Sequence, residues 1–168
     1  MKEMTEQNLK AAFAGESQAH MRYLAYAEQA EKEGKPNIAR LFRAIAQAER
    51  VHATGHLQAL GGVDRTSANL AAAEGGETFE VNEMYPPYIE AAKSDAEAEA
   101  EQSMSYALEA EKLHAALYRR AQTAVAAGRD FEIADIYVCP KCGHTVENAP
   151  PQDCPVCATA GERFMRFS

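Results

Sequence analysis

The segments Ala-Glu-Arg-Val-His at residues 48–52 and Ala-Glu-Lys-Leu-His at residues 110–114 decide the fold of this chain. Each carries Glu-x-x-His inside a long stretch rich in Ala, Glu, Gln and Leu, which predicts an α-helix. At about 100° per residue, the glutamate and the histidine of each copy lie on the same side of their helix. That side is also the apolar one, so each motif places a carboxylate and an imidazole where a hydrophobic core is expected. The apolar positions are Ile38, Phe42, Ile45, Ala53 and Leu60 around the first copy, and Met104, Ala107, Leu108, Ala115 and Val125 around the second.

Two further predicted helices also turn carboxylates toward their apolar faces. Glu16 lies in the middle of the face formed by Leu9, Phe13, Tyr23 and Ala27. Glu77 and Glu80 are three residues apart, on the same side of their helix as Val81 and Met84. The helices that carry Glu16 and Glu49 and those that carry Glu80 and Glu111 look like pseudo-symmetric halves of the bundle. Glu77 has no counterpart in the first half, so we expect it to be an extra ligand that makes the metal site asymmetric.

Several ionised carboxylates in a bundle interior require a strong positive charge to neutralise them. Two metal ions meet this need. One Glu from each of two helices, together with Glu-x-x-His from each of the other two, is the ligand set of the di-iron and di-manganese carboxylate bundles. The sequence therefore predicts a dinuclear metal site, with the candidate ligands Glu16, Glu49, His52, Glu77, Glu80, Glu111 and His114.

Other polar side chains near these positions have open roles. Tyr23 and Tyr85 are candidates for hydrogen bonding to metal-bound carboxylates, with ordinary core packing as the alternative. His20 and His56 each follow a candidate ligand by one helical turn. Both could line the site, but a salt-bridged or solvent-facing role is equally compatible with the pattern.

All four cysteines lie in the last 30 residues, as Cys139-Pro-Lys-Cys142 and Cys154-Pro-Val-Cys157. Two C-x-x-C pairs predict one metal bound by four thiolates, and this segment has too little apolar surface to fold without it. Iron and zinc both accept this geometry. A redox-active iron module attached to a dinuclear site could supply that site with electrons, whereas a structural zinc module has no such role. This favours iron over zinc as the metal bound by the four thiolates.

The bulk composition excludes other classes of protein. The net charge of −8 and the pI near 5.2 offer no basic stripe for nucleic acid. No run of 18 apolar residues predicts a membrane span, and the polar start is unlike a signal peptide. With paired cysteines that suit a reducing compartment, we expect a cytoplasmic protein.

Helix breakers divide the chain. Thr5 is expected to cap a helix ending near Glu33, and Pro36 to open a second one ending at residues 61–62. A third helix is expected from Thr66 or Ser67 to Lys93, bent at Pro86-Pro87, and a fourth from Ser94 to Gly128. The predicted domains are a four-helix bundle over 1–128, a connector over 129–136 and a metal domain over 137–168.

Five segments show a recognisable pattern: residues 14–19 (Ala-Gly-Glu-Ser-Gln-Ala), 48–52, 76–80 (Gly-Glu-Thr-Phe-Glu), 84–86 (Met-Tyr-Pro) and 110–114. With these residues assembled, the whole chain resembles the rubrerythrins. The resemblance implies a mainly α protein, a ferritin-like four-helix bundle followed by a small rubredoxin-like four-cysteine metal domain. Tyr137 and His20 depart from the family pattern, where Trp and Arg are common.

The resemblance also implies the roles of individual residues. The seven candidate ligands match the di-iron ligands of the family, with Glu49 and Glu111 as bridges, and His52 and Glu80 as the pair that one iron exchanges with its oxidation state. Cys139, Cys142, Cys154 and Cys157 match the ligands of a mononuclear iron.

The function that follows is a non-haem di-iron peroxidase that reduces hydrogen peroxide to water and protects against oxidative stress. Electrons would come from rubredoxin or an NAD(P)H-dependent reductase, because the chain has no dinucleotide-binding motif of its own. A homodimer is expected by family analogy. The alternatives are a ferroxidase or iron-handling ferritin relative, which would not need an electron-input module, and a non-enzymatic electron-transfer protein.

Overall fold

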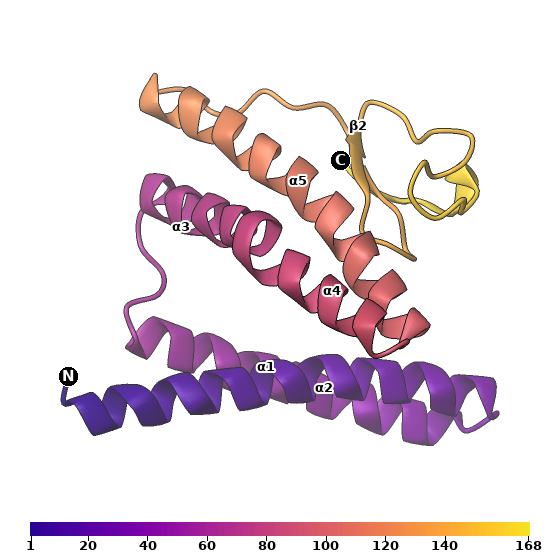
Figure 1. The fold of residues 1–168 in the computed structure, drawn as a ribbon. Helices are drawn as coiled ribbons and strands as arrows, with labels where there is room; N and C mark the ends of the chain where they lie inside the picture. Colours follow the sequence, from indigo (N-terminus) through magenta and orange to yellow (C-terminus); the bar gives the residue numbers. More distant parts are fainter. The chain divides into compact units, whose positions relative to one another are not determined.

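A computed structural model describes all residues from Met1 to Ser168, mostly as α-helix. The chain divides into two compact units, Met1–Asp64 and Arg65–Ser168, and each is described by itself (Figure 1). None of the helices combines the length and the apolar character that crossing a membrane would require.

The first unit is a hairpin of two long helices, α1 (Glu3–Lys32) and α2 (Pro36–Ala59). A tight turn joins them at Gly34, whose φ of +69° favours glycine. Small side chains allow the two helices to approach each other closely. The buried side chains are the alanines Ala19, Ala27, Ala30, Ala39, Ala46 and Ala53. The predicted Thr5 cap is wrong by three residues, because α1 begins at Glu3 with Lys2 at the N-cap position and no side chain caps it.

The second unit begins with a long helical run in three parts: α3 (Thr66–Phe79), the π-helical segment η1 (Glu80–Met84) and α4 (Tyr85–Ser94). The π-helical segment interrupts the run just before Pro86 and Pro87, where the sequence predicts a bend. At the end of η1, the backbone N–H of Tyr85 donates to the carbonyl of Glu80, five residues back.

The last helix of the second unit, α5 (Ala98–Ala126), packs against α3 and α4. Ser94 was expected to start it but is instead the last residue of α4. The turn between them places Ala96 at a φ of +58°, and Glu97 precedes the first turn of α5.

The cysteine-containing segment forms a three-stranded antiparallel sheet in the order β2-β1-β3. Its strands are β1 (Ile136–Val138), β2 (Thr145–Glu147) and β3 (Met165–Phe167), with a 3₁₀ turn at Gly161–Arg163. The buried core consists of the four cysteines and Phe164, with Tyr137 packed against it. A core built from thiols explains why so small a sheet needs a metal.

Candidate metal centres

The first unit brings three of the predicted ligands together. Glu16 on α1, and Glu49 and His52 on α2, offer ligand atoms that all lie within 4.8 Å of one another. His52 Nδ1 is 3.0 Å from Glu49 Oε2, a contact that the i,i+3 spacing produces on one helical face.

A matching group forms in the second unit from Glu77 on α3, and Glu111 and His114 on α5. Here His114 Nδ1 is 2.5 Å from Glu111 Oε2. Both side chains are shielded, with 27% of the His114 side chain and 17% of the Glu111 side chain exposed. Each unit therefore presents a cluster of two carboxylates and one imidazole.

The carboxylates of the second unit repel one another. Burial raises the pKa of Glu77 to about 8, supported by its hydrogen bond to the Glu111 carboxylate and by the charges of Glu111 and Glu80. Burial and the charge of Glu111 also raise the pKa of Glu80. Burial and the charges of Glu80, Glu111 and Glu77 raise the pKa of Tyr85. A proton or a metal cation must lie among these oxygens, and an oxygen-rich set with one imidazole suits iron.

The raised pKa of Glu77 predicts an unusual pH dependence for the metal-free protein. The folded state holds the Glu77 proton up to about pH 8, whereas the unfolded chain loses it near pH 4.5. Between these values the folded state binds more protons, so the stability of the folded state falls as pH rises. Thermal unfolding of the chelator-treated protein from pH 5 to pH 9 measures this trend.

The comparison variant is Glu77→Gln, which is expected to flatten the decline because it removes the titrating group. Identical pH profiles for the wild type and Glu77→Gln would contradict the assignment. Iron-loaded protein is expected to lack the decline, since the cation takes the place of the proton.

The four cysteines in the second unit form a cluster with the dimensions of a tetrahedral thiolate site. Cys139 Sγ lies 3.5 Å from Cys157 Sγ, and Cys142 Sγ lies 3.5 Å from Cys154 Sγ. Four sulfurs at about 2.3 Å from one metal would be about 3.8 Å apart, so the cluster needs only a small expansion to hold an ion. The donor set therefore fits a single iron ion.

Hydrogen bonds prepare one of these thiols for metal binding. Burial opposes ionisation, but the hydroxyl and backbone N–H of Thr159 and the neighbouring thiols lower the pKa of Cys157 to about 6. Burial instead raises the pKa of Cys142 and of Cys154. Thr159 was not singled out from the sequence, because a threonine two residues after a cysteine is not distinctive without its geometry.

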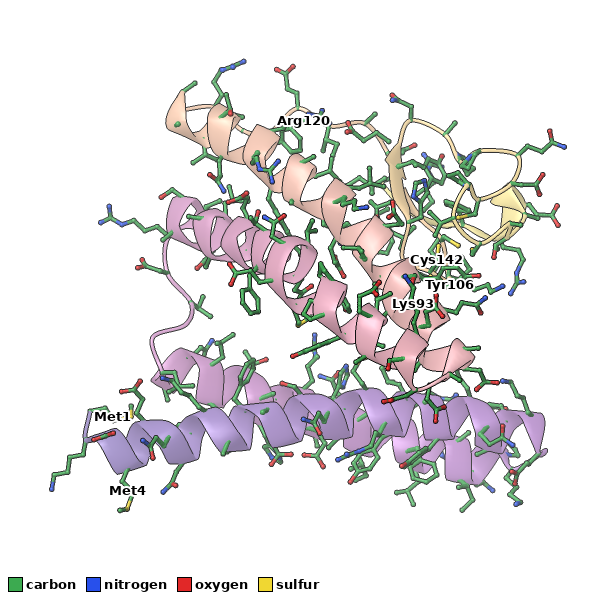
Figure 2. The ribbon with its side chains drawn as sticks, in the orientation of Figure 1. Met1, Met4, Lys93, Tyr106, Arg120 and Cys142 are labelled. Carbon is green, nitrogen blue, oxygen red and sulfur yellow. The ribbon has the colours of Figure 1, made fainter.

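The cysteine cluster lies against α5 (Figure 2). Tyr106 packs on the cluster, and the Lys141 ammonium lies 5.8 Å from the centre of the Tyr106 ring. A Cβ added at Gly143 would be 3.6 Å from Ala110 Cβ, so the first cysteine loop nearly touches the helix. The guanidinium of Arg120 forms an ion pair with Glu147 of β2.

The remaining predicted residues have packing contacts. The Tyr23 ring is 6.2 Å from that of Phe42, which is the core-packing alternative. His20 Nδ1 lies 2.7 Å from the Ala46 carbonyl and links α1 to α2. His56 is half-buried in the last turn of α2.

Comparison with known proteins identifies both parts of the chain. The family model for rubrerythrin matches residues 7–122, and the model for the rubredoxin-like domain of rubrerythrin matches residues 137–165. Rubrerythrin-2 of Clostridium acetobutylicum is 40% identical, with 98% of this chain and 97% of that protein covered. Nigerythrin of Nitratidesulfovibrio vulgaris is 33% identical, with 97% and 86% covered.

Solved structures of nigerythrin are also similar to the chain. The mixed-valence state has a TM-score of 0.55 at 31% identity, and the fully reduced, all-ferrous state has a TM-score of 0.56 at 30% identity. Both matches cover 97% of this chain and 86% of the nigerythrin chain. The fold class is therefore ferritin-like, with a small rubredoxin-like region at the C-terminal end.

Proposed function

The chain belongs to the rubrerythrin family, and from this premise we propose that it is a peroxidase that reduces hydrogen peroxide to water. The reaction consumes one peroxide molecule, two electrons and two protons and yields two water molecules. The observation that supports the proposal most directly is that a carboxylate–histidine cluster and a four-thiolate cluster lie along the same helix, α5.

The proposed di-iron ligands are the seven residues that the sequence pattern selects. The structure-based clusters Glu16, Glu49, His52 and Glu77, Glu111, His114 support six of them. The electrostatic influence of Glu111 and His114 on Glu80 supports the seventh. Cys139, Cys142, Cys154 and Cys157 are the proposed ligands of the mononuclear iron.

A bound di-iron pair would supply Lewis acidity and two electrons. The protein's own groups manage protons and charge. As a proposed ligand, Glu77 would give up to the metal the proton that its raised pKa keeps in the metal-free cluster. Tyr85 keeps its phenolic proton because its pKa is raised, and it can donate a hydrogen bond in the same cluster.

The electron source is proposed to be a separate rubredoxin or an NAD(P)H-dependent reductase, which would reduce the cysteine-bound iron one electron at a time. We propose a homodimer, by analogy with the family. Thiolate ligands suit the reducing conditions of the cytoplasm, where protection against oxidative stress would be needed.

Stopped-flow absorbance of the fully reduced, iron-loaded protein tests the proposal. Mixing with one equivalent of hydrogen peroxide is expected to oxidise the protein rapidly, and dioxygen much more slowly. Equal rates with dioxygen, or accumulation of ferric mineral while the thiolate iron stays reduced, would favour iron handling. The absence of any reaction with peroxide would favour the alternative of a non-enzymatic electron-transfer protein.

A further inference from the structure

One side chain of the cysteine module contacts the histidine of the second metal cluster. Thr145, the first residue of β2, lies with its Oγ1 2.9 Å from His114 Nε2. The same hydroxyl donates a hydrogen bond to the carbonyl of Gly143, at 2.8 Å. Only 8% of Thr145 is exposed, which is unusual for a polar residue on such a small sheet.

These two contacts assign a proton to Nε2 of the His114 ring. A hydroxyl has one proton, and Thr145 gives it to the Gly143 carbonyl, so its oxygen must accept the proton of His114 Nε2. The other nitrogen, Nδ1, is then left facing Glu111. A histidine whose outer N–H is held by the protein presents the opposite nitrogen to a metal in a fixed orientation.

The surroundings offer the Nε2 side few other partners. An apolar cavity of about 460 Å³ borders His114 and Thr145, and its walls include Leu70, Leu117, Val125, Phe131, Ile133 and Ile136. If Thr145 were replaced, the partly shielded imidazole N–H would face this mainly apolar cavity, whose polar lining residues are Thr66, Tyr118 and Asp130. The hydroxyl is therefore the group that satisfies this donor.

The same contacts connect the four-cysteine cluster to the cluster of Glu77, Glu111 and His114. Gly143 follows Cys142 directly, so a route runs from the Cys142 thiolate through the peptide to the Gly143 carbonyl, then through the Thr145 hydroxyl to the His114 ring. Gly143 can make this approach because its φ is +75° and because Ala110 on α5 leaves room. All of these residues belong to the second unit.

We propose that Thr145 is a positioning residue that fixes His114 as an Nδ1 metal ligand and couples the four-cysteine iron to the metal cluster of Glu77, Glu111 and His114. The proposal rests on the proposed function, in that both sites hold iron. It assigns the coupling to one hydroxyl group rather than to general packing.

The test compares Thr145→Val, which keeps the shape but not the hydroxyl, with Thr145→Ser, which keeps the hydroxyl. In the full iron-loaded chain, Thr145→Val is expected to lose di-iron occupancy to a competing chelator about 10-fold more readily, as happens when an outer hydrogen-bond partner is removed. With two equivalents of peroxide, enough to oxidise the cysteine-bound iron as well as the di-iron pair, the ferric-thiolate absorbance is expected to appear more slowly. Thr145→Ser should match the wild type in both measurements.

Equal behaviour of Thr145→Val and the wild type would overturn the proposal, as would equal losses in both variants. If the wild type reacts with peroxide but the variants do not differ, the positioning role fails and the proposed function stands. If the wild type itself does not react, chelator competition still tests the positioning role. Nitrogen-15 NMR of the zinc-loaded wild type gives a check without mutation, because a proton on Nδ1 of His114 would also refute the proposal.

Discussion

Cys139→Ser is expected to remove the iron from the cysteine module and to unfold the module while leaving the helices intact. Cys139 is 1% exposed and belongs to a core made mostly of metal-binding thiols. Binding of a structural metal by four thiolates contributes about 10 kcal/mol or more to the folding of such a segment. No apolar core of sufficient size remains to replace it.

The effect of Cys139→Ser on activity should distinguish the role of the cysteine-bound iron from that of the di-iron site. Steady-state peroxide reduction with a reductase is expected to fall to background, because electrons no longer enter. A single oxidation of the pre-reduced di-iron site by peroxide is expected to persist. Metal analysis, resistance of the tail to proteolysis and stopped-flow absorbance measure the three effects.

Glu162→Ser is the matched control, because Glu162 lies in the same module with an exposed side chain. It should retain iron and turnover. Full turnover in Cys139→Ser would refute the role of the module as the electron entry point. Loss of helical signal in Cys139→Ser would show that its effect is not confined to the module.

Glu111→Gln is expected to abolish di-iron binding while the cysteine iron remains. Glu111 has the most connections in the second cluster: it contacts His114 Nδ1, is hydrogen-bonded to Glu77, and its charge raises the pKa values of Glu80 and Tyr85. As a proposed bridge it would serve both ions, so its loss should weaken binding by more than the roughly 100-fold cost of losing an outer-shell partner.

Iron analysis and peroxide-dependent oxidation measure the effect. Glu109→Gln is the control on the same helix, since Glu109 is half-exposed and pairs only with Lys112 on the surface. In the metal-free Glu111→Gln protein, the pKa of Glu77 should also move down toward its ordinary value. Retention of both iron ions of the di-iron site by Glu111→Gln would remove Glu111 from the ligand set.

The sequence predicted the mainly helical fold because helix formation depends on short-range patterns, and for the same reason it selected six residues that the structure brings together in two groups. A Glu-x-x-His motif places its two side chains on one helical face whatever the tertiary structure. The opening of α2 at Pro36 and the tight turn at Gly34 likewise depend on local backbone preferences. The comparisons then confirmed the family and the fold.

The features that sequence reasoning missed depend on contacts between distant residues. Thr145 and His114 are 31 positions apart, and no pattern in the sequence marks them as partners. The start of α5 was misplaced because Ser94 is a good cap in isolation, whereas the turn formed through Ala96 delays the helix. The proposed domain boundaries and ligand roles remain predictions that the experiments above address.

The π-helical segment before α4 changes the angular phase of the residues that follow it. In a regular α-helix, residues five apart point about 140° away from each other, since each residue turns by about 100°. Because Tyr85 N–H bonds to the carbonyl of Glu80, five residues span about one full turn of the wider helix. Glu80 and Tyr85 thus lie on the same side, and the wider turn gives the acidic cluster a phenol that an unbroken α-helix would direct elsewhere.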